Sequence, residues 1–145
     1  MVIMPTYVGL SSILLLLVVF VGCTVFSKAA RPLRVHDIHI TGQASIDPAE
    51  LYAVVGEEIR WHNDLSAPIY LGFLGVQPTP QAGCERGFKT WYGVIKDIIR
   101  IPAGEYASLC FLRSRMVIKY NIWTDMADPF HSMSPTAVIH LDEAT

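Results

Sequence analysis

Histidine, methionine and cysteine are the side chains of this sequence best suited to hold a metal ion. His131 and Met133 stand two positions apart in a segment with no strand or helix periodicity. An imidazole and a thioether together suit copper(I), and His62 or Met126 could supply a further donor. The alternative is an ordinary loop with no bound metal, and the sequence leaves both interpretations open.

Cys84 and Cys110 are the cysteines that follow the apolar N-terminal part of the chain. Two cysteines in one small domain most simply pair in an oxidising compartment, so a disulfide is predicted. One alternative is a pair of buried thiols. The other is a Cys110 thiolate that binds copper, which excludes the disulfide because one sulfur cannot do both.

Two segments are candidates for a partner-binding surface. Phe88, Trp91 and Tyr92 lie close together between glycines, and aromatic residues of this kind are enriched at protein interfaces. The alternative is that these aromatic residues cap the open end of a β-sandwich. The second candidate is the loop from Met126 to Met133, which carries Phe130.

Several classes of function find no support in the sequence. There is no GxSxG or HExxH motif and no glycine-rich phosphate loop before a helix, so we expect no enzyme. The net charge of -2 is spread along the chain without a basic patch, which argues against nucleic-acid binding. The pair Glu57-Glu58 is expected to be a solvated strand edge. His36 and His39 lie three apart on an expected strand and therefore face opposite sides, so they cannot chelate one ion together.

The elements that would position these residues are extended strands. From Val54 to Leu74, apolar residues alternate with polar ones on both sides of a polar turn, which predicts two strands joined as a central hairpin. Residues 46–50 are expected to form a short helical turn or a bend. Further strands are expected over 34–41, 94–101, 105–112, 116–124 and 136–141, and residues 51–55 lead into the central hairpin. Seven or eight short strands with regular turns predict an all-β fold, a β-sandwich with Greek-key connections.

The N-terminus is one long apolar run. Val8 to Phe26 carries no charge and is long enough to span a bilayer or to serve as a secretory signal. Phe20-Val21-Gly22-Cys23-Thr24 resembles a bacterial lipoprotein cleavage site, and this resemblance implies lipidation of Cys23. An uncleaved anchor with an outside domain is an alternative, and the positive charges that follow the run would instead favour a cytoplasmic domain. The expected organisation is therefore a signal peptide or membrane anchor (1–26), a tether (27–33) and a domain (34–145).

The domain resembles cupredoxin-like domains over residues 35 to 141. The resemblance rests on two ordered sets of residues, namely Gly56, Glu57, Ile59, Trp61, Asn63 and Pro68, and then Pro102, Gly104, Tyr106 and Cys110. The family places a copper-ligand histidine after the proline, where this chain has Ile69. It also places a histidine and a methionine shortly after the cysteine, where residues 111–116 contain no histidine. The resemblance thus implies a cupredoxin-like fold without type 1 copper. An immunoglobulin-like topology is the rival, although Trp61 precedes both domain cysteines.

These observations predict a membrane-tethered, extracytoplasmic module in a bacterial periplasm or cell envelope. It would bind a protein partner in a membrane or periplasmic complex and carry no cofactor. The alternative is a copper protein for electron transfer or copper handling, which would use His62, His131, Met133 and possibly Cys110.

Overall fold

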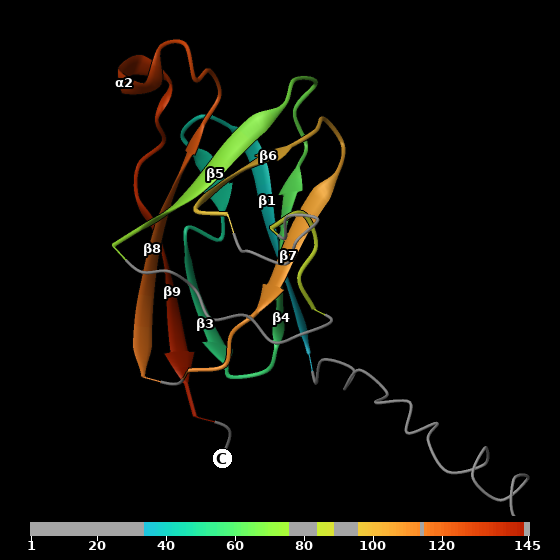
Figure 1. The fold of residues 1–145 in the computed structure, drawn as a ribbon, viewed down its shortest axis with the longest axis vertical. Coiled ribbons are helices and arrows are strands. Elements are labelled where there is room, and N and C mark those ends of the chain that lie inside the picture. Colours follow the sequence, from blue (N-terminus) through green and yellow to red (C-terminus); the bar gives the residue numbers. More distant parts are fainter. Residues whose placement is uncertain (1–33, 76–83, 89–95, 114, 144–145) are drawn as a thin grey trace, which may run out of the picture.

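The computed structural model describes residues 34–75, 84–88, 96–113 and 115–143, and these form two β-sheets packed face to face (Figure 1). The first sheet has the order β2-β1-β4-β7. Its strands are β1 (Val35–Gly42), β2 (Ser45–Asp47), β4 (Glu58–Asn63) and β7 (Tyr106–Cys110). The second sheet has the order β3-β9-β8-β5-β6. Its strands are β3 (Glu50–Val54), β5 (Ile69–Leu74), β6 (Ile98–Ile101), β8 (Met116–Trp123) and β9 (Ala137–Asp142).

Both sheets are mixed. β1 runs parallel to β4, and β3 runs parallel to β9, whereas the other neighbours are antiparallel. The prediction of an all-β sandwich is confirmed. The described residues contain more strands than expected, because residues 45–47 form β2. Of the two alternatives expected for residues 46–50, the helical turn is wrong and the bend is present at positions 48 and 49. That segment holds β2 and the start of β3, separated at Pro48, which lacks the N–H that a continuous strand would need.

The predicted central hairpin is also wrong. β4 and β5 are both strands, as expected, but they lie in opposite sheets. Residues 64–68 carry the chain from one sheet to the other. The Asn63 side-chain amide holds this crossover, because it donates to the carbonyl oxygens of Ala67, Ile101 and Pro102 at 2.9 to 3.0 Å. Its side-chain oxygen accepts the N–H of Leu65 at 3.1 Å.

Replacing Asn63 with alanine is expected to lower the free energy of unfolding by roughly 2–3 kcal/mol, because buried carbonyl oxygens then lose their donor. Asn63→Asp should cost more, since a carboxylate would face the same oxygens. Denaturant titration of both variants measures the difference. Equal stability of the wild type and Asn63→Ala would show that the amide does not hold the crossover.

The core lies between the two sheets and follows the alternation of the strands. In β4, Ile59 and Trp61 point inward and are fully buried, whereas Arg60 and His62 point outward. The Trp61 ring stands edge-on to three other rings, Phe73, Phe88 and Tyr120, with centroids 5.6 to 5.9 Å away. These rings come from the second sheet and from the segment 84–88, whereas Trp61 belongs to the first sheet, so Trp61 is the centre of the core.

The described residues contain one turn of α-helix, α2 (Pro129–Ser132), between β8 and β9. Within the same residues, no helix has the length and apolar character needed to cross a membrane. The predicted hydrophobic helix, the Cys23 lipidation site and the tether lie outside the described residues.

Candidate functional site

The connection between β8 and β9 carries the most exposed large apolar side chain of the described residues. We call residues 124–136 the apex loop, because α2 projects at the upper end of the sandwich (Figure 1). Phe130 is 90% exposed, and the neighbouring Met126 and Met133 are 40% and 45% exposed. This loop is the second surface candidate from the sequence, and it presents an aromatic ring and two thioethers to solvent.

Hydrogen bonds fix the apex loop to the sandwich although its tip is apolar and exposed. Within the loop, the Ser132 N–H donates to the Asp128 carbonyl at 3.1 Å and closes the helical turn. A second bond within the loop runs from the Thr124 N–H to the Ser132 carbonyl at 3.2 Å. Further bonds of 2.7 to 3.1 Å tie the loop to its surroundings. They run from the Gln43 amide to the carbonyls of His131 and Met133, from the Asn121 amide to that of Ser134, and from the Ser134 N–H to that of Ile122. The loop is therefore a fixed platform for Phe130.

The loops at this end of the sandwich carry negative charges. The loops that meet here are 42–45, 64–68, 102–105 and 124–136, and the bonds of Gln43 and Asn63 join them in pairs. They contain four carboxylates and no lysine or arginine. These carboxylates are Asp64, Glu105, Asp125 and Asp128. The end of the sandwich that carries the exposed apolar tip is thus acidic, and Asp125 and Asp128 stand in the apex loop itself.

The residues proposed for a copper site are only partly close to one another. His131 and Met133 share the apex loop, but the His131 Nδ1 atom lies 2.9 Å from both carboxylate oxygens of Asp128. His62 lies on the outer face of the first sheet, where its Nε2 atom lies 2.7 Å from Asp37. No described contact joins His62 to the loop. Within the part of the chain that the structure describes, no three histidine, cysteine or acidic residues form a group that could hold a metal ion.

The outer face of the first sheet brings together residues that the sequence did not associate. His39 in β1 is directly opposite His62 in β4, and their rings stack with centroids 4.9 Å apart. His39 Nδ1 lies 2.7 Å from the Asp64 carboxylate. The Tyr106 ring of β7 lies beside His62, with centroids 5.3 Å apart. Alternation places each of these side chains outward, but only the parallel register of β1 and β4 makes the two histidines neighbours.

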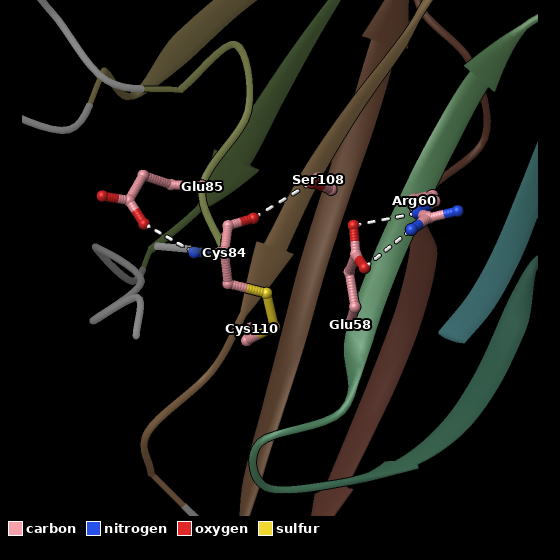
Figure 2. The surroundings of a disulfide bond; sticks show 6 residues. All are labelled: Glu58, Arg60, Cys84, Glu85, Ser108 and Cys110. Carbon is pink, nitrogen blue, oxygen red and sulfur yellow. Dashed lines mark hydrogen bonds and ion pairs between the residues drawn. A yellow bond between two sulfur atoms is a disulfide. The ribbon is translucent and has the colours of Figure 1, made fainter. Parts of the chain in front are cut away.

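The predicted disulfide is confirmed: Cys84 and Cys110 are bonded, with Cα atoms 5.6 Å apart (Figure 2). Beside it, the Ser108 hydroxyl donates to the Cys84 carbonyl at 3.0 Å. Arg86 exchanges two backbone hydrogen bonds with Ser108, so the segment 84–88 extends the first sheet beyond β7. Cys110 therefore does not supply a thiolate for copper, and a copper site that includes Cys110 is excluded.

Phe88 does not form part of a partner surface. Its side chain is fully buried and contacts Trp61 and Phe73, with ring centroids 5.6 and 5.5 Å away. Gly87 makes this possible, because its φ of +82° and the 3.2 Å approach of the Ala107 Cβ to the position of a Cβ at Gly87 exclude most side chains. A buried ring cannot contact a partner, so this part of the prediction is corrected. Trp91 and Tyr92 lie outside the described residues.

Glu57 and Glu58 are not the solvated pair that the sequence suggested. Glu58 is buried, and Arg60 donates two hydrogen bonds of 2.9 Å to its two oxygens (Figure 2). The Arg60 hydrogen bond holds the pKa of Glu58 below its usual value in spite of burial. Burial would raise the pKa of Glu57, but the hydrogen bonds from the Val54 N–H and His36 outweigh it, so this pKa is lowered too.

Acid should destabilise the domain through these two carboxyl groups. Each has a lower pKa in the folded than in the unfolded chain, so its ionised form stabilises the fold above the unfolded pKa of about 4.3. That contribution is lost as the pH falls through the folded-state pKa. Urea titrations between about pH 3 and pH 6 should show it, and Glu58→Gln should flatten the dependence. Parallel curves for the wild type and Glu58→Gln would contradict the assignment.

Among known proteins, similarity to this chain was found only in solved structures. No family model and no curated protein matches the chain. Similar solved structures include a mutant amicyanin in the Cu(I) state, with 16% identity and a TM-score of 0.47, covering 79% of this chain and 87% of that one. A purple cupredoxin from Nitrosopumilus maritimus has 17% identity and a TM-score of 0.44, covering 73% and 98%. The multicopper oxidase mgLAC has 14% identity and a TM-score of 0.43, covering 77% of this chain and 39% of its own. At such identities the likeness concerns the fold alone.

Proposed function

We propose that the chain is a cupredoxin-like protein-binding module that docks a partner through its apex loop. The observation that carries this proposal is Phe130, which is 90% exposed on a loop held by hydrogen bonds. An exposed ring contributes little to the stability of its own fold. Aromatic side chains of this kind dominate the binding energy of protein interfaces.

The fixed backbone of the apex loop favours binding. A loop that is already ordered loses little conformational entropy when a partner covers it, so more of the contact energy appears as affinity. Met126 and Met133 flank the aromatic ring, and methionine side chains adapt to irregular apolar surfaces. Phe130 would therefore be the anchor, with the two methionines filling the space around it.

The acidic border of the apex loop defines the chemistry of the partner. Charges around an interface select partners of complementary potential and speed their association. Asp125 and Asp128 border the apolar tip, and no lysine or arginine stands in the four loops at this end. The partner is a protein with an apolar pocket bordered by lysine or arginine, as expected for a subunit of a membrane or periplasmic complex. It is not a nucleic acid, whose phosphates would be repelled.

We also propose that the module is tethered to a membrane and faces an extracytoplasmic compartment, a bacterial periplasm or cell envelope. The Cys84–Cys110 disulfide supports this location, because disulfides persist in oxidising compartments. Residues 1–26 would be the lipoprotein signal or anchor, with Cys23 as the lipidated residue and 27–33 as the tether. The start of β1 and α2 lie at opposite ends of the sandwich, so the tether would leave the apex loop free (Figure 1).

The proposal includes neither catalysis nor type 1 copper. The residues present do not fit such a copper centre, because Ile69 is a buried aliphatic side chain and Cys110 is bonded to Cys84. Copper handling by His131 and Met133 remains the alternative function. Loading the full chain with copper and replacing both residues tests it: an unchanged copper stoichiometry would rule it out.

Photocrosslinking of the full chain in its own cells tests the docking proposal. A photoreactive phenylalanine analogue replaces Phe130 in one strain and Val117 in another. Val117 is a matched control, because it is 50% exposed and apolar but lies on β8, away from the apex loop. We expect one adduct of defined mass from position 130 and none from position 117.

Charge reversal makes the same experiment specific. Asp125→Lys with Asp128→Lys should abolish the adduct from position 130, because the acidic border would become basic. Phe130→Ala should leave the free energy of unfolding unchanged, since the ring is exposed. Equal adducts from both positions, or an adduct that survives charge reversal, would overturn the proposal.

A further inference from the structure

Two histidine side chains lie side by side on the outer face of the first sheet. His39 and His62 occupy directly opposite positions on two parallel strands, and both side chains point outward. Their rings are almost parallel, with an interplanar angle of 13° and centroids 4.9 Å apart. Both lie on regular strands, so the backbone holds two imidazoles side by side without any loop.

A carboxylate orients each ring of this pair. Asp64 lies 2.7 Å from Nδ1 of His39, and Asp37 lies 2.7 Å from Nε2 of His62. A neutral imidazole that donates one ring N–H to a carboxylate keeps a lone pair on its other nitrogen. The nitrogens left for a ligand are Nε2 of His39 and Nδ1 of His62.

We propose that His39 and His62 form a binding site for a divalent transition-metal ion such as Zn²⁺ or Cu²⁺. Imidazole is a preferred ligand of both ions, and a carboxylate on the second nitrogen is the usual support of a metal-bound histidine. The two rings must tilt out of the stack to converge on one ion. This rotation is soft, because the second side-chain torsion of histidine has broad minima. Water completes the coordination.

The charged groups bonded directly to the two rings favour a cation. Asp37 and Asp64 contribute two negative charges directly to the two rings. The nearest arginine on the same strand, Arg60, is already paired with Glu58. On the other side of His62 lies the Tyr106 ring, and the guanidinium groups of Arg60 and Arg86 lie over that ring, 5.3 and 4.0 Å from its centroid. This site is separate from the apex loop, so it does not depend on the proposed docking function.

Titration of the full chain with Zn²⁺, in competition with a chromogenic chelator, tests the site. We expect the wild type to bind one ion that is lost, or weakened at least about tenfold, in His39→Ala and in His62→Ala. Asp37→Asn and Asp64→Asn keep both imidazoles and should weaken binding by about 10- to 100-fold. These two variants keep the test valid if an alanine variant does not fold.

His140 provides the matched control. It also bonds to a carboxylate, with Nε2 2.8 Å from Glu50, and it also stacks on a ring, with its centroid 4.5 Å from that of Tyr52. Its neighbouring ring has no metal-binding nitrogen, so His140→Ala should bind Zn²⁺ as the wild type does. The absence of saturable binding, or equal loss in the His140 and His39 variants, would overturn the proposal. Phe130→Ala should bind Zn²⁺ normally, which separates this site from the docking function.

Discussion

Trp61→Ala is expected to lower the free energy of unfolding by about 3–5 kcal/mol. The side chain is fully buried and contacts Phe73, Phe88 and Tyr120, so its removal leaves a cavity lined by three rings. These rings come from different elements and cannot all move into the space. Because small domains are stable by only about 5–15 kcal/mol, the variant should lose a large fraction of its total stability.

Denaturant titration of the purified chain measures this effect, with Phe130→Ala as the control. Both substitutions remove an aromatic ring, but Phe130 is exposed, so its loss should change the stability by less than about 0.5 kcal/mol. Similar losses in the two variants would mean that Trp61 is not the centre of the core.

Removing the disulfide is the second large effect we expect. Cys84→Ser with Cys110→Ser should cost about 3.5 kcal/mol, as loop-closure entropy predicts for two cysteines separated by 26 residues. The bond also holds the segment 84–88 against β7. Without it, Phe88 would be retained in the core only by its own packing and the two backbone bonds between Arg86 and Ser108.

Thermal unfolding of the oxidised chain, the reduced chain and the double variant measures this contribution. The reduced chain and the double variant should unfold at similar temperatures, both below the oxidised chain. Ser108→Ala removes only the hydroxyl bond to the Cys84 carbonyl and should cost about 0.5–1.5 kcal/mol. A double variant as stable as the oxidised chain would show that the fold does not need this link.

Alternation along the chain was sufficient to predict most strands and their buried faces. Ile59 and Trp61 are inside and Arg60 and His62 are outside, as the period of two requires. Which strands pair with one another was not predictable in the same way. A five-residue polar turn suits a hairpin as well as a crossover, and the choice depends on the hydrogen bonds that Asn63 makes with residues almost forty positions away.

The same holds for the candidate sites. A site within one contiguous loop could be recognised from the sequence, whereas a site that depends on contacts between distant residues could not. Phe130 and its methionines could be recognised from composition, because the loop is contiguous. Phe88 could not be placed, because its burial depends on the Cys84–Cys110 bond and on the close approach of Gly87 to β7. The pairing of His39 with His62 depends on a parallel register between strands that are not neighbours in sequence.

The position of β9 has a consequence for the order of folding during synthesis. β9 follows every other described strand along the chain, yet it lies inside the second sheet, between β3 and β8. The Val138 N–H donates to the Ala49 carbonyl at 2.8 Å, and among the described strands β3 pairs only with β9. Until residues 137–142 have left the ribosome, β3 therefore has no strand to pair with, and one edge of β8 is unpaired. Unpaired edges attract other chains, and strands that pair over long sequence distances form slowly. A nascent chain of this protein would thus need protection from aggregation until β9 has been synthesised.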